Sequence, residues 1–181
     1  MLNEAINYAV AMHSGQMRKA TDIPYIVHPL ECVAIASRMT SDEEMLAAAA
    51  LHDTVEDCKK NGASIEEIKE KFGERVAHFV AHESEDKSKT WMERKQATID
   101  LLKNSTKEEC ILVLADKLSN MRSVEHDYKV HGEELWQRFN MKDKNKIAWY
   151  YSSILDAIED KVSEFEAFAE YKELINRVFG I

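Results

Sequence analysis

The chain has 181 residues, of which 45% are hydrophobic and 31% are charged, and its 33 acidic and 24 basic side chains give a formal net charge of −9. A chain of this length can close one substantial core, so we expect a single domain spanning residues 1–181. The acidic balance argues against a broad nucleic-acid or anionic-membrane surface, so we expect neither as a partner.

Residues 2–13 carry apolar side chains near helical spacing and predict a helix. Glu4 and polar residues interrupt this segment where a signal peptide needs a continuous apolar stretch, and no later run approaches membrane-spanning length. Three cysteines, Cys32, Cys58 and Cys110, have no paired spacing, which argues against a disulfide framework and against a cysteine zinc site. We therefore expect a cytoplasmic protein with buried or idle thiols.

Helix-breaking residues are rare, since both prolines lie in DIPYIVHP and only five glycines occur. We expect Pro29 in the first turn of a helix, preceded by His28, with an apolar face of Leu30, Val33, Ala34 and Met39. TSDEEML predicts the start of a helix with Ser41 as its N-cap. This is the second helix of a pair, and we expect it to run to about Asp57. The predicted fold class is all-α.

The second half of the chain continues this helical pattern. A capping box at Ser64 and Glu67 begins a short helix that Gly73 ends. HESEDKSKT, the most polar internal stretch, is short and flanked by predicted helices, so it predicts an exposed loop and not a domain boundary. The other predicted helical segments are residues 74–82, 91–104, 107–122, 132–140, 145–158 and 161–179.

Four ionisable groups follow the apolar run that ends at Leu51: His52, Asp53, Glu56 and Asp57. On a helix, with about 100° per residue, they share one face. A solvated acidic face is the ordinary explanation of such a pattern. However, burying a histidine beside three carboxylates is unfavourable unless a cation is present, and the run before His52 predicts burial. The stretch therefore indicates a divalent metal.

Two further ligands are available elsewhere in the chain. His28 can bring an imidazole, and Asp116 follows the apolar run from Ile111 to Ala115. Asn120 falls one turn after Asp116 on the same helix face. Two imidazoles and two carboxylates suit a first-row divalent ion. The oxygen share favours Mn²⁺, with Zn²⁺, Fe²⁺ and Co²⁺ as competitors.

The order of His28, His52–Asp53 and Asp116 resembles the signature of HD-domain metal-dependent phosphohydrolases. More narrowly, GQMRKATDIPYIVHPLECVA, AAALHDTVED and LADKLSNMRS resemble the hydrolase domain of RelA/SpoT-type enzymes and the small alarmone hydrolases. The resemblance implies an HD-domain helical bundle. It also implies Mn²⁺-dependent removal of the 3′-pyrophosphate from guanosine 3′,5′-bispyrophosphate or the pentaphosphate, with this nucleotide as the small-molecule partner.

Carried over position by position, the resemblance implies a role for each group of residues. His28, His52, Asp53 and Asp116 match the metal ligands, and Glu56 and Asp57 match the pair that orients and deprotonates the attacking water. Substrate-binding positions are matched by Arg18, Lys19, Asn120 and Ser123. Lys117 and Ser119 depart from the pattern of these hydrolases, which often have Arg and His at the two positions.

Two alternatives remain at this stage. One is an HD phosphohydrolase that acts on another phosphorylated nucleotide or dinucleotide cofactor, and the other is a helical protein that binds the alarmone without cleaving it. The roles of Arg94, Lys95, Lys117 and Tyr150 and the oligomeric state stay open.

Overall fold

The computed structural model describes residues 1–19, 21–58 and 61–181, and within these ranges the chain is helical, with no strand beyond an isolated bridge between Met17 and Pro24. The predicted all-α fold class is confirmed. None of the helices in the described ranges combines the length and the apolar character needed to span a membrane.

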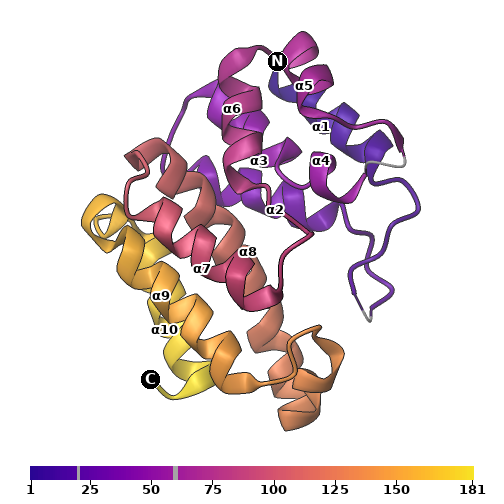
Figure 1. Cartoon of the computed structure of the whole chain (residues 1–181). Helices are drawn as coiled ribbons and strands as arrows, with labels where there is room; N and C mark the ends of the chain where they lie inside the picture. Colours follow the sequence, from indigo (N-terminus) through magenta and orange to yellow (C-terminus); the bar gives the residue numbers. More distant parts are fainter. Residues whose placement is uncertain (20, 59–60) are drawn as a thin grey trace. The chain divides into compact units, whose positions relative to one another are not determined.

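Two compact units make up the chain (Figure 1). The first contains Met1–Glu85 and Ile111–Asp116, and the second contains Asp86–Cys110 and Lys117–Ile181. The change of unit after Glu85 falls within HESEDKSKT, which we predicted to be an exposed loop and not a domain boundary. The first two residues of this stretch, His82 and Glu83, are helical. A single domain over residues 1–181 stays a prediction.

The first unit is built around α3 (Glu43–Leu51), which packs against α1 (Leu2–Met12), α2 (Val27–Ala36) and α6 (Glu74–Glu83). The alanines at 47–50 of α3 are all buried. Their small side chains let neighbouring helices approach closely on several sides at once. The unit also contains α4 (Thr54–Asp57), α5 (Ile65–Phe72) and the Ile111–Asp116 part of α8.

The structure agrees with the predicted N-cap of α5 and differs from the predicted N-cap of α3. Ser64 caps α5 as predicted, by accepting a hydrogen bond from the Glu67 N–H, but the reciprocal half of the predicted capping box is not formed among the described residues, and the Glu67 carboxylate accepts from the Tyr8 hydroxyl instead. The predicted Ser41 cap is wrong, because Asp42 occupies the N-cap of α3 and its carboxylate accepts from the Glu44 and Met45 N–H groups. A carboxylate at this position also interacts favourably with the positive end of the helix dipole.

The helix predicted to continue to about Asp57 is interrupted at His52 and Asp53. The prediction that His52, Asp53, Glu56 and Asp57 share one face of a continuous helix is therefore wrong. The Thr54 hydroxyl donates to the Leu51 carbonyl at 2.7 Å, and His52 Nδ1 lies 2.9 Å from the Ala49 carbonyl oxygen. Side chains therefore take carbonyls that a continuous helix would bond to backbone N–H groups.

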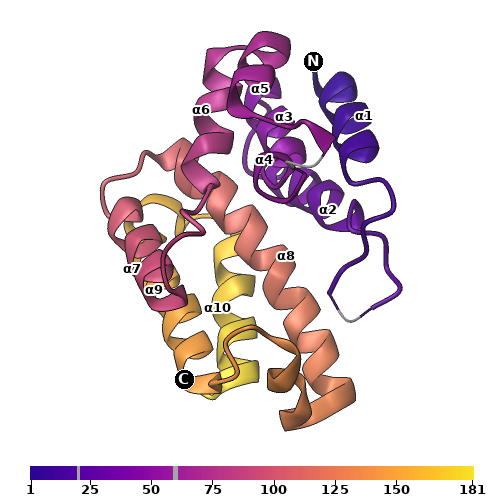
Figure 2. The ribbon, with the colours of Figure 1, turned by 45° about the vertical axis from the view of Figure 1, so that its right-hand side comes forward.

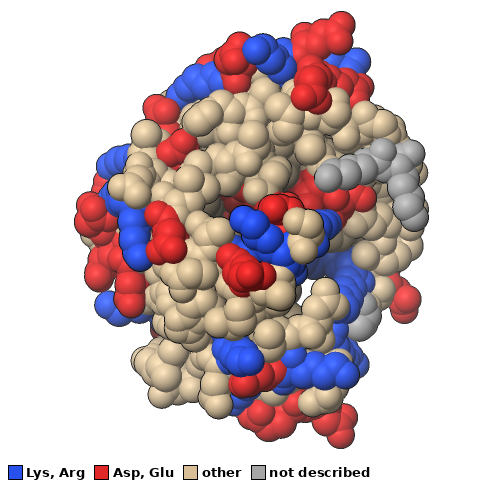
Figure 3. All heavy atoms as spheres, viewed as in Figure 1, with Lys and Arg blue, Asp and Glu red and all other residues tan. Residues whose placement is uncertain are grey.

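The second unit contains α7 (Trp91–Leu102), α9 (Lys144–Val162) and α10 (Glu166–Phe179), with α9 packed against the other two. The rest of α8 (Lys107–His131) and the 3₁₀ helix η2 (Gly132–Arg138) complete it. Helix α8 is longer than the predicted 107–122. Arg122 makes a two-pronged ion pair with Glu170 on α10, which runs beside this part of α8 in Figure 2. Figure 3 shows acidic and basic side chains interspersed on one face.

Candidate metal centre

Three segments of the first unit bring the predicted metal ligands together. His28 lies in the first turn of α2, His52 and Asp53 lie at the break between α3 and α4, and Asp116 lies on α8. His28 Nε2 is 3.1 Å from Asp116 Oδ1 and 3.5 Å from Asp53 Oδ2. His52 Nε2 is 3.0 Å from Asp53 Oδ2 and 3.8 Å from Asp116 Oδ1. These separations are those of ion pairs between imidazole and carboxylate groups, and they are short enough for all four side chains to reach one ion.

The hydrogen bond at Nδ1 sets the tautomer of His52. Because a carbonyl oxygen only accepts, Nδ1 carries the proton toward Ala49, which leaves the Nε2 lone pair for a metal in the neutral ring. Nε2 is buried and has no well-directed hydrogen-bond partner among the residues of the described ranges. A buried lone pair facing two carboxylates is unfavourable unless a cation lies between them, so this donor set fits a divalent metal.

The shifted pKa values of His52 and Asp53 also indicate that this group of side chains favours a positive charge. Burial by itself lowers the pKa of His52, but the charges of Asp53 and Asp116 outweigh burial and raise it to about 10. For Asp53, burial opposes ionisation, and the neighbouring His52 and His28 nevertheless hold its pKa below the ordinary range. Without a metal, a proton on His52 supplies the positive charge that the group requires.

Cys32 belongs to the same cluster and was not foreseen from the sequence. Single donor atoms of His28, Cys32, His52 and Asp116 all lie within 4.8 Å of one another, and all four residues are buried. We expected buried or idle thiols, and all three cysteines are buried. We also placed Leu30 and Ala34 on the apolar face of α2, but both are exposed, and the buried face contains His28, Cys32 and Ile35. Cys32 lies four residues after His28, a spacing that places both side chains on the same face of a helix, and this spacing could have identified Cys32 from the sequence.

Tyr25 is a second residue that sequence reasoning missed. Its hydroxyl donates to Asp53 Oδ2 at 2.6 Å, and its ring lies 4.9 Å from that of the buried His13. Burial and the carboxylate of Asp53 raise the pKa of Tyr25 well above its ordinary value, so the hydroxyl keeps its proton and stays a donor. Position 25, three residues before His28, carries no signal of this contact in the sequence.

The predicted basic pair lies on the segment that leads to Tyr25. The Arg18 N–H donates to the Ile23 carbonyl and the Tyr25 N–H donates to the Gln16 carbonyl, which ties the two ends of the segment together. The Arg18 guanidinium carbon lies 5.9 Å from the centroid of the Tyr25 ring. Lys19 is exposed. Arg18 is thus connected through Tyr25 to Asp53.

The predicted acidic pair lies on α4, one turn beyond His52 and Asp53. Glu56 is half-buried and its Oε2 accepts a 3.3 Å hydrogen bond from the Glu85 N–H, while Asp57 is exposed. Because α4 begins directly after Asp53, its two carboxylates are carried by the same short segment as two of the clustered donors.

The remaining predicted positions belong to the second unit and are described within it. Asn120 and Ser123 are half-buried on α8, one and two turns after Asp116 along that helix. In the same unit, the Lys95 and Lys117 ammonium groups lie 4.6 and 6.0 Å from the centroid of the Tyr150 ring. Both distances are within the range of cation–π contacts.

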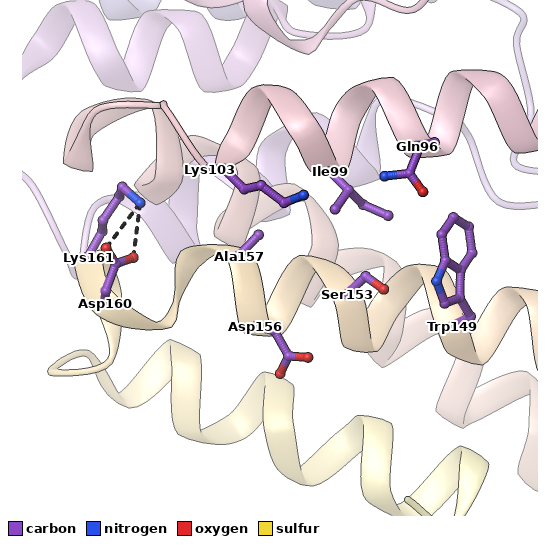
Figure 4. A pocket seen from close by; sticks show the side chains of 9 residues that line it. All are labelled: Gln96, Ile99, Lys103, Trp149, Ser153, Asp156, Ala157, Asp160 and Lys161. Atoms are coloured by element: carbon purple, nitrogen blue, oxygen red, sulfur yellow. Dashed lines mark hydrogen bonds and ion pairs between the residues drawn. The ribbon is translucent and has the colours of Figure 1, made fainter.

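The second unit also has an open pocket of about 530 Å³ between α7 and α9 (Figure 4). Ile99 and Ala157 contribute apolar lining, and Trp149 forms one end. Lys161 at the other end is paired with Asp160, and Lys103 is paired with Asp100. None of the site residues predicted from the sequence lines this pocket.

Comparison with known proteins identifies the relatives of this chain. Residues 5–142 match the family described as HD domain. Over 127 residues the chain is 37% identical to the guanosine-3′,5′-bis(diphosphate) 3′-pyrophosphohydrolase MESH1 of Xenopus tropicalis, covering 68% of this chain and 69% of the relative. The GTP pyrophosphokinase of Myxococcus xanthus is 30% identical over 197 residues. That match covers 98% of this chain but 25% of the longer relative.

Two solved structures are also similar. The crystal structure of lmo0812 from Listeria monocytogenes EGD-e superposes with a TM-score of 0.76 at 32% identity, covering 85% of this chain and 99% of the other. A metazoan orthologue of SpoT that hydrolyses ppGpp superposes with a TM-score of 0.80 at 27% identity, covering 97% and 94%. The chain belongs to the HD-domain family and is homologous to the MESH1 hydrolases and to RelA/SpoT-type enzymes.

Proposed function

We propose that this protein is a metal-dependent hydrolase that removes the 3′-pyrophosphate of guanosine 3′,5′-bispyrophosphate or the pentaphosphate, yielding GDP or GTP and pyrophosphate. The single observation that carries the proposal is the buried group of His28, His52 and Asp116 with Asp53 at its edge, in a chain whose relatives are named as hydrolases of this nucleotide. A cytoplasmic location is part of the proposal.

His28, His52, Asp53 and Asp116 are proposed to hold a divalent ion, and the carboxylate share of this set favours Mn²⁺. A bound divalent ion would polarise a phosphoryl oxygen and lower the pKa of the attacking water. The protein contributes the orientation of the imidazoles: Ala49 holds the proton of His52 on Nδ1, so that Nε2 is free to bind.

Glu56 and Asp57 are proposed to orient the water and accept its proton. The water oxygen forms a bond to the phosphorus attached to the ribose 3′ oxygen, that phosphorus–oxygen bond breaks, and the 3′ oxygen regains a proton. A carboxylate base within hydrogen-bond reach of the water contributes about 10²- to 10⁴-fold to such a step. The backbone N–H of Glu85 restrains Glu56 in place for this role.

Arg18 and Lys19 are proposed to bind the phosphate groups of the substrate, since a guanidinium and an ammonium offset phosphate charge. Asn120 and Ser123 are proposed to make polar contacts to the guanosine part. A locally basic segment explains how a chain with a net charge of −9 can hold a highly anionic nucleotide.

The direct test is incubation with guanosine 3′,5′-bispyrophosphate and Mn²⁺, with and without a chelator, while pyrophosphate and GDP are quantified. We expect metal-dependent release of both products in equal amounts. Asp116→Asn should abolish the release. Asp127→Asn, on the same helix but outside the cluster, should retain it.

A panel of other phosphorylated nucleotides, including a dinucleotide cofactor with a 2′-phosphate, is compared by kcat/KM. A higher value for one of these would replace the proposed substrate. Tight binding of the alarmone without turnover in any metal would instead favour the binding-protein alternative.

A further inference from the structure

We infer that Cys32 supplies a sulfur donor to the metal centre and thereby strengthens the binding of Zn²⁺ and Co²⁺ relative to the binding of Mn²⁺. The inference rests on the metal centre of the proposed function and deepens it. The other two cysteines, Cys58 and Cys110, lie outside the cluster of candidate donors.

The geometry places the Cys32 sulfur within the donor cluster. Sγ lies 3.7 Å from Nδ1 and 3.9 Å from Nε2 of His28, and the four donor atoms of the cluster are all within 4.8 Å of one another. Metal bonds of about 2.0–2.3 Å to nitrogen, oxygen and sulfur put neighbouring donors roughly 3–4 Å apart. The spacing around His28 therefore suits a shared ion.

A separate observation supports a cation in this cluster. The buried Nε2 of His52, which belongs to the same group, has no well-directed hydrogen-bond partner among the described residues, although it lies 3.0 Å from Asp53 Oδ2. A buried thiol by itself does not require a metal or a hydrogen-bond partner, because it behaves as a small hydrophobic group. The same thiol is better explained as part of a site when it lies beside a buried carboxylate and a buried imidazole nitrogen that has no well-directed hydrogen bond.

Burial distinguishes Cys32 from the predicted ligand Asp53. The side chain of Asp53 is 22% exposed, whereas Cys32, His28 and Asp116 are each less than a tenth exposed. Asp53 Oδ2 also accepts the hydrogen bond of Tyr25. Cys32 therefore binds from the protein interior and Asp53 binds from the solvent side.

The expected selectivity follows from ligand chemistry. Thiolate is a soft ligand that favours Zn²⁺ and its spectroscopic substitute Co²⁺, whereas Mn²⁺ favours oxygen donors. Binding requires that the thiol release its proton to solvent as the metal–sulfur bond forms. Replacing Cys32 should therefore weaken Zn²⁺ and Co²⁺ binding by at least about tenfold and change Mn²⁺ binding much less.

The experiment is a titration of the metal-free protein with Co²⁺, followed by absorption spectroscopy. A Co²⁺–thiolate bond gives a charge-transfer band in the near ultraviolet, which imidazole and carboxylate ligands do not give. We expect this band in the wild type and not in Cys32→Ser or Cys32→Ala. Cys58→Ser is the matched control, because Cys58 is also buried beside a histidine, 3.3 Å from His13 Nδ1, and its replacement should leave the band intact.

A double variant keeps the test decisive if the Cys32 variants do not fold. With Cys58 and Cys110 both replaced by Ser, Cys32 is the one remaining cysteine of the three, and the band should persist. If the wild type binds Co²⁺ without showing the band, Cys32 is not a metal ligand, whereas the proposed metal centre is retained. Failure of the wild type to bind Co²⁺, Zn²⁺ or Mn²⁺ would overturn the metal centre itself.

Discussion

The hydroxyl of Tyr25 donates a 2.6 Å hydrogen bond to Oδ2 of Asp53. The same oxygen lies 3.0 Å from His52 Nε2 and 3.5 Å from His28 Nε2. Tyr25 thus fixes the carboxylate orientation that faces both imidazoles. Because the Arg18 guanidinium lies over the Tyr25 ring, the proposed phosphate-binding segment and the proposed metal centre share one anchoring side chain.

Replacing Tyr25 with Phe should weaken Mn²⁺ binding by about 10- to 100-fold, the usual effect of removing a group that orients a metal ligand. The ring contact with His13 is preserved, so the fold should be retained. Isothermal titration calorimetry with Mn²⁺ measures the affinity, and circular dichroism checks the fold.

Tyr8→Phe is the matched control for this prediction. The Tyr8 hydroxyl also donates to a carboxylate, Oε2 of Glu67 at 2.8 Å, but that carboxylate is outside the donor cluster. Unchanged Mn²⁺ affinity in Tyr25→Phe, or an equal loss in Tyr8→Phe, would contradict the positioning role.

Glu56→Gln should lower kcat by about 10²- to 10⁴-fold, because an amide cannot accept the proton of the attacking water. The amide oxygen can still accept the hydrogen bond from the Glu85 N–H, so the local structure should be kept. Mn²⁺ affinity should change little. Single-turnover kinetics with the alarmone and a parallel Mn²⁺ titration separate the two effects, and an unchanged kcat would exclude Glu56 as the base.

Arg18→Ala should raise KM by about 10- to 100-fold, as expected from the loss of one charge-assisted hydrogen bond to phosphate. Steady-state kinetics at two salt concentrations measure this effect, and the wild type should be the more salt-sensitive of the two proteins. Arg38→Ala removes an exposed arginine just beyond α2 and serves as the control. Equal effects of the two substitutions would argue for a general charge effect instead of a contact.

Metal binding should release a proton from His52. The pKa of His52 in the metal-free protein is raised to about 10, so the ring is protonated at neutral pH, and an incoming ion must displace that proton. Affinity for Mn²⁺ should therefore increase with pH and level off once the pH exceeds that pKa. The dependence of the calorimetric enthalpy on the buffer reports the number of protons released, and a value near zero at neutral pH would contradict this account.

The sequence alone was sufficient for the fold class and for the choice of metal ligands to test. Rare glycine and proline with helical spacing predicted an all-α chain, and this is confirmed. His52 and Asp116 each follow an apolar run, and this local pattern predicts that both lie near a core. Such signals are readable because they depend on neighbours within one or two helical turns.

Contacts between separate segments were decided only by the tertiary structure. The break after Leu51 depends on side chains that capture backbone carbonyls, and the place of Cys32 depends on which face of α2 packs inward. The hydrogen bond from Tyr25 to Asp53 joins segments whose local patterns are independent of each other. Sequence periodicity determines which side chains share a face of one helix, whereas the packing of α2 against the small side chains of α3 determines which faces meet.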